Sequence, residues 1–484
     1  MDSYVTRLEP SPSQTLANTR LSEGTYRVPT AHMTDSEIQR HIDKMTFAPK
    51  NSSMGIDQEC EPVVAAIVEG DELVVPRAYG FSTFGPPAAG WAVEDFDTTP
   101  RPAPKFNGIL RVEQQQPEAS DKVVSQLRSQ GGAVLVLPCG YGKTTVALDI
   151  VSRVQGRALI LVHKSVLLTQ WEERIAQFLP SAKIGILRGD RMEADQSMDI
   201  VIGMLQSVYQ RGCEYKHMLS GFNLLIVDEA HRVPAATFFS AVKSVSARFT
   251  LGLTATPDRR DGMTGLLYAA LGDVAFQVQR EPSSQAFACV KEICCSPDVR
   301  EKTLYGKHTV NFSKLITDLS KDKMRTHSIV EDIAAVLCRP RYVIVLADRT
   351  ALLKDIQTQL MSLQIPCLLD DPHGGARVII GSTKASERDD ALSAIVVLST
   401  FSLAAEGLDR ARLDTLVLAT PKGDITQSVG RILRQHADKQ PPLVLDYIDS
   451  VASGVLTGLR RKREKCLKQH GFKIVDNLGD TVPK

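Results

Sequence analysis

The sequence predicts an α/β protein built from two tandem domains, each with a parallel sheet. Apolar runs rich in valine, isoleucine and leucine alternate with segments of helical periodicity. This alternation is typical of βαβ units with helices on both faces of a sheet. The strand-like runs form two sets, separated by a weakly patterned stretch at roughly 275–320. The 484 residues also exceed the roughly 250 to 300 that one hydrophobic core holds, so the chain is long enough for about three domains.

Each run that we expect to be a strand is short and apolar, as in a buried parallel sheet. The first set comprises VLVLP (134–138), ALILVH (158–163), DIVIGM (199–204), LLIVDEA (224–230) and FTLGLTATP (249–257). The second set comprises YVIVLAD (342–348), RVIIGS (377–382), AIVVLST (394–400) and TLVLATP (415–421). We therefore expect a small N-terminal domain at 1–105, two α/β domains at 106–278 and 279–450, and a basic C-terminal tail at 451–484.

The two flanking segments carry weaker patterns. Residues 62–80, PVVAAIVEGDELVVPRAYG, contain two β-rich runs around the turn EGD and predict a hairpin. Prolines gather between residues 85 and 104 and favour an extended linker. The segment GLRRKREKCLK at 458–468 predicts a basic helix, which either follows a phosphate backbone or is simply solvated.

Composition excludes several classes of protein. The net charge of +1 gives no global field for nucleic acid, so any such binding depends on local patches. The nine cysteines are scattered and show no CxxC spacing, which argues against a structural zinc site and a disulfide framework and favours a reducing compartment. No apolar run approaches the roughly 20 residues of a membrane helix. We therefore expect an intracellular protein without a membrane partner.

The segment LPCGYGKTT at 137–145 lies between a predicted strand and a predicted helix. Glycines at 140 and 142 allow the backbone amides to turn toward an anion, and the helix start adds its positive dipole end. Lys143 would then reach the β- and γ-phosphates, and the Thr144 hydroxyl would hold a magnesium ion. The P-loop pattern asks for a glycine where this chain has Leu137, so a plain glycine turn is the alternative.

The segment LLIVDEAH at 224–231 is an apolar strand that ends in two carboxylates. Strand ends are where α/β sheets present their ligands. Asp228 would bind magnesium, and Glu229 would orient and deprotonate the attacking water. A strand followed by an acidic helix start is the simpler interpretation of this tetrapeptide. Its position after a candidate P-loop favours the nucleotide site.

The motifs occur in the order found in superfamily 2 helicases. LPCGYGKTT, DEAH, GLTATP (252–257) and QSVGRILR (427–434) resemble motifs I, II, III and VI, and many members of that superfamily lack the first P-loop glycine. STFSLAAEGLD (399–409) resembles motif V, and LRVEQ (110–114) resembles the adenine-reading segment. Across residues 106–450 the chain is most similar to the XPB-like branch of DNA helicases and to transcript-release helicases of large cytoplasmic DNA viruses such as poxviruses.

The resemblance implies two RecA-like domains with ATP between them and a set of site residues. The phosphate cradle would comprise Pro138, Cys139, Gly140, Tyr141, Gly142, Lys143, Thr144 and Thr145. Arg111 and Gln114 would read the adenine, Asp409 would lie near the ribose, and Gln427, Arg431 and Arg434 would complete the cleft. Arg431 and Arg434 would share one face if motif VI is helical, and would stabilise charge on the γ-phosphoryl group.

Two further groups follow from the resemblance. His231, Thr254 and Thr256 would couple nucleotide state to strand grip, although a buried histidine and strand-end hydroxyls are the plain alternatives. Nucleic-acid phosphates would meet Lys164, Gln206, Ser207, Lys384 and Thr400, each of which could also be an ordinary surface residue.

The implied function is an ATP- and Mg²⁺-dependent DNA helicase or translocase that acts in transcription or repair, with an RNA polymerase or transcription complex as a further expected partner. An RNA-dependent ATPase and a nucleic-acid-binding or polymerase-binding scaffold with decayed activity are the alternatives. For a viral chain, the resemblance implies the host cytoplasm or the virion as its location.

Overall fold

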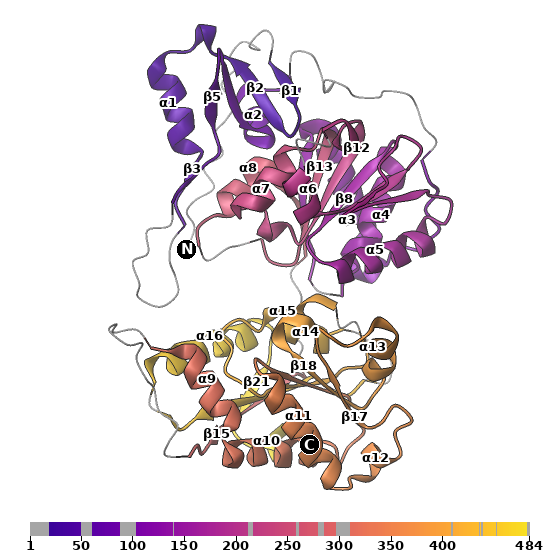
Figure 1. The fold of residues 1–484 in the computed structure, drawn as a ribbon, viewed down its shortest axis with the longest axis vertical. Helices are drawn as coiled ribbons and strands as arrows, with labels where there is room; N and C mark the ends of the chain where they lie inside the picture. Colours follow the sequence, from indigo (N-terminus) through magenta and orange to yellow (C-terminus); the bar gives the residue numbers. More distant parts are fainter. Residues whose placement is uncertain are drawn as a thin grey trace. The chain divides into compact units, whose positions relative to one another are not determined.

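The computed structural model describes residues 19–49, 61–87, 103–138, 140–211, 216–257, 261–278, 285–296, 310–407, 410–434, 436, 439–451 and 453–481. The chain divides into two compact units, Met1–Gln279 and Arg280–Lys484. Each contains a mainly parallel sheet flanked by helices (Figure 1), which confirms the predicted α/β fold class. None of the helices in these ranges combines the length and apolar character of a membrane span.

The first unit is built on an eight-stranded sheet with the order β10-β9-β11-β8-β12-β13-β7-β14. All neighbouring strands are parallel except β9 and β10. Alternate residues of one strand enter two different cores, since Val134 packs in one cluster and Leu135 in the other. The strands are β7 (Gly132–Val136), β8 (Ala158–Val162), β9 (Ile184–Arg188), β10 (Arg191–Met192), β11 (Ile200–Met204), β12 (Phe222–Asp228), β13 (Ala247–Thr254) and β14 (Val274–Gln277).

Six α-helices connect or flank the strands of this sheet in the described part of the unit. They are α3 (Gln116–Gln130), α4 (Lys143–Val154), α5 (Ser165–Phe178), α6 (Leu205–Arg211), α7 (Ala236–Lys243) and α8 (Thr264–Leu271). Short 3₁₀ turns cover η2 (Val112–Gln114), η3 (Lys216–Leu219) and η4 (Ala230–Arg232).

A small N-terminal module belongs to the same compact unit. Its four antiparallel strands have the order β1-β2-β6-β5, and the pairing of β5 with β6 confirms the hairpin around EGD. The elements are β1 (Arg20–Ser22), β2 (Thr25–Pro29), η1 (Thr30–His32), α1 (Asp35–Lys44), β3 (Thr46–Phe47), β4 (Val63–Val64), β5 (Ile67–Glu69), β6 (Glu72–Pro76) and α2 (Arg77–Phe84).

Arg77 joins this module to the motor sheet. Its guanidinium is 3% exposed and donates to the carbonyls of Ala247 and Arg248 at the start of β13. Burial lowers the pKa of Arg77 to about 10, so it stays protonated at neutral pH. The backbone N–H of Gly24 adds a bond of 2.8 Å to the carbonyl of Lys243. The module and the sheet therefore share one hydrophobic cluster and a polar seam.

The second unit contains a seven-stranded sheet with the order β17-β18-β16-β19-β20-β15-β21, and every pair in it is parallel. Its strands are β15 (Phe287–Ile293), β16 (Val343–Ala347), β17 (Ala376–Ile379), β18 (Val396–Thr400), β19 (Thr415–Leu418), β20 (Leu443–Asp449) and β21 (Lys473–Val475). Its helices are α9 (Phe312–Lys321), α10 (Lys323–Val336), α11 (Thr350–Ser362), α12 (Pro366–Leu369), α13 (Ala385–Leu392), α14 (Phe401–Gly407), α15 (Thr426–Ile432), α16 (Gly454–Gln469) and η5 (Leu478–Thr481).

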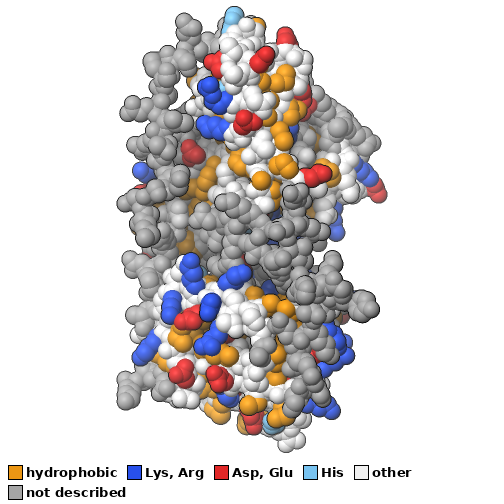
Figure 2. All heavy atoms as spheres, turned by 90° about the vertical axis from the view of Figure 1, so that its left-hand side faces the viewer, with side chains coloured by type: hydrophobic (Ala, Val, Ile, Leu, Met, Phe, Trp, Pro, Cys, Tyr) orange, Lys and Arg blue, Asp and Glu red, His pale blue; other side chains and the backbone are white. Residues whose placement is uncertain are grey.

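The segment expected as a basic tail at 451–484 is instead part of this second fold. Strand β21 extends the sheet beside β15, and Leu467 of α16 is fully buried. Arg463 is 2% exposed and bonds Asp446 at 2.8 Å. The expectation of a separate tail was wrong. The helix that carries the basic residues also has apolar side chains, such as Leu467, that pack into the second unit. Figure 2 shows several Lys and Arg side chains on the visible face of this unit, interspersed with acidic and hydrophobic ones.

We predict that Arg77→Ala lowers the stability of the first unit by about 1 to 3 kcal/mol, because two buried carbonyls lose their donor. Chemical denaturation followed by circular dichroism measures this change. The matched control is Arg40→Ala, since Arg40 is an exposed arginine of the same module. Equal stability of the Arg77 variant and the wild type would contradict the structural role of the guanidinium.

Candidate functional site

The motif residues of the first unit gather at one edge of its sheet. Strands β11, β8, β12, β13 and β7 are neighbours and run parallel, so their carboxyl ends meet at the same edge. The segment resembling motif I directly follows β7, and those resembling motifs II and III begin in the last residues of β12 and β13 and extend beyond them. This edge is where open α/β sheets bind their ligands.

The glycine-rich loop connects β7 to α4 as the sequence predicts. Gly140 and Gly142 have φ values of 85° and 74°, a backbone region that favours glycine. The Lys143 ammonium donates to the carbonyl of Leu137 at 3.1 Å and so lies across the loop. Thr144 and Thr145 occupy the first turn of α4. The loop has the strand, turn and helix start that a phosphate cradle requires.

Gln116 was missed by the sequence analysis, although it joins two of the predicted segments. Its side-chain N–H donates to the carbonyl of Tyr141 at 2.8 Å and to Gln114 Oε1 at 3.0 Å. Its Oε1 accepts from the backbone N–H of Arg111 at 2.8 Å. A Cβ at Gly142 would lie 2.5 Å from Gln116 Nε2. The buried amide thus holds residues 111–114, the predicted adenine-reading segment, against the glycine-rich loop.

The carboxylate of Asp228, the last residue of β12, is held by two donors. The indole N–H of Trp171 donates to its Oδ2 at 3.0 Å, and the backbone N–H of Glu229 donates to its Oδ1 at 2.9 Å. Burial, and then the negative charge of Glu229, raise the pKa of Asp228 to about 6 against the opposing effects of Trp171 and Lys143. The two donors fix the orientation of the carboxylate. Trp171, on α5, was another residue that no motif indicated.

Glu229 and His231 link the end of β12 to the end of β13. Glu229 has a φ of 50°, a left-handed conformation that is uncommon for a residue other than glycine. His231 Nδ1 lies 3.3 Å from Glu229 Oε2 and 3.2 Å from Thr254 Oγ1. Thr254 is fully buried, and its hydroxyl oxygen accepts from the backbone N–H of Thr256 at 3.1 Å. One histidine therefore contacts both the acidic motif and the TAT motif.

The expected polymer contacts of this unit lie along the same edge. Lys164 immediately precedes α5 at the end of β8, and burial followed by the charge of Arg232 lowers its pKa. Gln206 and Ser207 lie in α6, which follows β11, and the Ser207 hydroxyl accepts from the backbone N–H of Gly189 at 3.1 Å. Gln206 is exposed, whereas Lys164 and Ser207 are half-buried.

His163, beside Lys164, is a buried histidine that the sequence analysis did not select. It is 9% exposed, and neither ring nitrogen has a hydrogen-bond partner among the described residues. Burial, followed by the positive charges of Arg232 and Lys164, lowers the pKa of His163 to about 3. The ring is therefore neutral and adds no charge to this part of the edge.

The second unit carries the remaining motif residues. Gln427 and Arg431 lie in α15, whereas Arg434 lies two residues beyond its last residue. The N–H of Arg434 still approaches the carbonyl of Arg431 at 3.5 Å, so the turn continues past the helix. Arg431 is buried and Arg434 is half-buried. The expectation that both arginines occupy one helical face is therefore met only in part.

Two predicted phosphate contacts of this unit lie at or after the ends of two neighbouring strands. Thr400 closes β18, and its hydroxyl accepts from the backbone N–H of Leu403 at 3.4 Å. Lys384 is exposed and immediately precedes α13, the helix that follows β17. Because β17 and β18 are parallel neighbours, both residues lie at one edge of the second sheet. Cys139 and Asp409 lie outside the described residues.

The family described as "Type III restriction enzyme, res subunit" matches residues 109–259, which contain the loop, acidic and TAT motifs. A protein of Acanthamoeba polyphaga mimivirus, provisionally named an ATP-dependent RNA helicase, is 29% identical over 388 residues, covering 79% of this chain and 72% of its own length. The DNA 3'-5' translocase XPB2 of Sulfurisphaera tokodaii is 32% identical over 207 residues, covering 42% of this chain and 45% of its own length.

The fold is similar to that of a solved nucleic-acid enzyme. The ATP-dependent Type ISP restriction-modification enzyme LlaBIII, solved bound to DNA, aligns with a TM-score of 0.55 at 15% identity, covering 76% of this chain and 31% of its own length. At this identity the likeness concerns the fold alone. The family match, the relatives and the fold all agree with the helicase-like order of the sequence motifs. The chain is an ATP-hydrolysing enzyme that is similar in its core to helicases of superfamily 2, including an XPB-type translocase and helicases of large DNA viruses.

Proposed function

We propose that the protein is an ATP-dependent DNA translocase or helicase. The observation that carries this proposal is the shared sheet edge of the first unit. Candidate nucleotide contacts follow β7 and β12, and candidate polymer contacts follow the neighbouring strands β8 and β11. On the nucleotide side of this edge, His231 contacts both Glu229 at the end of β12 and Thr254 at the end of β13, and β12 lies directly beside β8. A conformational change on ATP binding or hydrolysis at β12 would thus reach the candidate polymer contacts through the adjoining strand β8.

The residues of the edge fit the chemistry of phosphate-bond cleavage. Lys143 and the loop amides would hold the phosphates, and Glu229 would orient the attacking water and accept its proton. Thr144 and Asp228 would hold a magnesium ion, because a hydroxyl and an ionised carboxylate are the oxygen ligands that this ion prefers. When bound, that ion would neutralise negative charge on the phosphates. Trp171 would keep the Asp228 carboxylate in its orientation through the indole bond.

The second unit would supply the remaining positive charge. Arg431 and Arg434 would approach the γ-phosphoryl group when the two units close on ATP, with Gln427 and Asp409 near the same nucleotide. Closure on binding and opening after hydrolysis would move the two units relative to each other. Lys384 and Thr400 of the second unit would then exchange phosphate contacts with Lys164, Gln206 and Ser207 of the first. This alternation would produce stepping along one strand.

DNA is the polymer we propose. The TAT motif and the segment QSVGRILR resemble motifs III and VI of XPB-like proteins rather than those of DEAH-box RNA helicases. One relative is named a DNA translocase. RNA is the second candidate, because the mimivirus relative is provisionally named an RNA helicase. A role beside a stalled RNA polymerase, in which movement on the template frees the transcript, is the cellular setting we propose for a DNA-tracking motor.

The first prediction from this proposed function concerns the polymer that stimulates ATP hydrolysis. Steady-state ATP hydrolysis should rise when single- or double-stranded DNA is added to the wild type, and RNA should raise it less. Glu229→Gln should lower kcat by about 10² to 10⁴ while nucleotide affinity stays close to the wild-type value, because a general base is lost. Phosphate release measures kcat, and titration with a fluorescent nucleotide measures nucleotide affinity.

The matched control is Glu173→Gln, which removes an exposed carboxylate on α5 away from the sheet edge. It should hydrolyse ATP at the wild-type rate. Stimulation by RNA alone would replace the DNA proposal with the RNA-dependent ATPase. Full activity of Glu229→Gln would remove the assigned role of this carboxylate.

The second prediction concerns coupling through the histidine. His231→Ala should keep most of the basal ATP hydrolysis but lose the increase that DNA produces, because the contact between the acidic motif and Thr254 is gone. Thr254→Val should have the same effect, and the double variant should be no worse than either single variant. Additive losses in such a double-mutant cycle would mean that the two residues act separately.

The third prediction concerns the second unit. Arg434→Ala should lower kcat by about 10³ or more with little loss of ATP affinity, as expected for an arginine finger. The control is Arg339→Ala, which removes an exposed arginine of the same unit. Single-turnover hydrolysis with pre-bound ATP separates chemistry from binding. A rise in KM with unchanged kcat would instead assign Arg434 to ground-state binding.

A further inference from the structure

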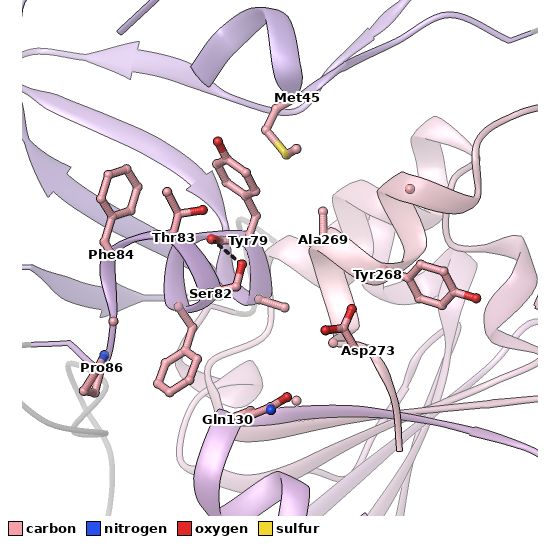
Figure 3. Close-up of a pocket in the computed structure, with 16 residues that line it drawn as sticks. Met45, Tyr79, Ser82, Thr83, Phe84, Pro86, Gln130, Tyr268, Ala269 and Asp273 are labelled. Carbon is pink, nitrogen blue, oxygen red and sulfur yellow. Dashed lines mark hydrogen bonds between the residues drawn. The ribbon is translucent and has the colours of Figure 1, made fainter. Parts of the chain in front are cut away.

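A cavity of about 600 Å³ lies between the N-terminal module and the first motor domain, within one compact unit. Its volume is in the range of small-molecule sites. Figure 3 shows the side chains of α2 on one side of the cavity, those of α8 and its following residues on the other, and Gln130 at the end of α3. None of its lining residues belongs to the motifs of the ATP site.

Three helices end at this cavity. Its wall includes Ser82, Thr83 and Phe84, the last residues of α2, together with Gln130 of α3 and Ala269 of α8. Each of these helices is followed by a glycine with positive φ, at 85, 131 and 272. The carbonyl ends of helices carry partial negative charge and stabilise cations. The approach of three such helix ends would favour a cation in the cavity.

One carboxylate adds a full negative charge. Asp273 directly follows the glycine that ends α8, and it is the only charged side chain among the residues that line the cavity. It is exposed, and neither a hydrogen bond nor an ion pair engages its carboxylate within the described part of the chain. Figure 3 shows the Asp273 carboxylate facing the side of the cavity that α2 forms. A cation in the cavity would therefore find a counter-charge that is already exposed.

Aromatic side chains supply the apolar part of the wall. Tyr79, Phe81, Phe84 and Tyr268 line the cavity together with the thioether of Met45. Aromatic faces attract organic cations, and the ammonium of Lys44 already lies 5.4 Å from the centre of the Tyr79 ring. A single carboxylate surrounded by rings is a poor set of ligands for a metal ion, which requires several oxygen or nitrogen donors. The chemistry favours a cation on an apolar stem.

We propose that this cavity binds an organic cation, an ammonium or guanidinium group carried on an aliphatic chain. The charged group would pair with Asp273 and the helix carbonyl ends, and its stem would contact the aromatic rings. Because the cavity has walls from both the N-terminal module and the motor domain, such a ligand would stabilise their association. The cation comes either from a free polyamine or from a basic side chain of another polypeptide.

Calorimetric titration of the full-length protein, without nucleic acid, tests the proposal. Spermidine serves as the free cation, and an N-acetylated arginine dipeptide amide serves as the peptide-borne one. At least one of them should bind saturably at a single site, and Asp273→Asn should weaken that binding by about tenfold, since a charged partner is lost. Glu173→Gln, an exposed carboxylate elsewhere in the unit, should leave the affinity unchanged.

Asp273→Glu keeps the charge and should retain more affinity than Asp273→Asn. The bound cation should also raise the melting temperature of the wild type more than that of Asp273→Asn. Stronger binding of the dipeptide identifies a polypeptide source, and stronger binding of spermidine identifies a free polyamine. No binding by either probe, or an equal affinity of wild type and Asp273→Asn, overturns the proposal. ATP hydrolysis is not the readout, so this result is independent of the proposed motor function.

Discussion

The parallel alignment of the buried strands is the constraint on which the rest of the structure depends. Strands covered by helices on both faces must be apolar along their length, as Ile160 and Leu161 are on β8. Polar side chains then appear mainly where a strand ends, and one inside a strand, such as Asp446 of β20, is paired. Because neighbouring strands run in one direction, these ends meet at a single edge, and Lys143, Asp228 and Thr254 lie along it although more than a hundred residues separate the first from the last.

Buried hydrogen bonds then fix the geometry of that edge. Gln116 bonds both the segment before α3 and the loop after β7, and Trp171 orients the carboxylate that ends β12. Each donor comes from a helix that packs on the sheet, so the packing of the core also positions the reactive groups. An unpaired polar group in such a place would cost about 1 to 3 kcal/mol, so removing either donor would destabilise this edge.

Much of this organisation could be predicted from local sequence. Alternating apolar and helical segments indicated the parallel sheets, and the glycines of the phosphate loop indicated a turn that the structure contains. The segment after residue 451 could not be interpreted in that way. Its positive residues suggested a tail, but Arg463 is paired with Asp446 and Leu467 is buried, so its apolar face became apparent only against the second sheet. Edge strands such as β21 are short and carry little periodic signal.

The sequence by itself determined which chemical groups end each strand and in what order they occur, because strand and turn propensities act over a few residues. The tertiary structure alone decided which partners complete those groups. Trp171 meets Asp228 because β8, the strand before α5, lies beside β12, and Arg77 meets the start of β13 because the N-terminal module packs there. Such contacts depend on strand order and helix packing, which are set by the burial of the whole core and leave no local pattern in the chain.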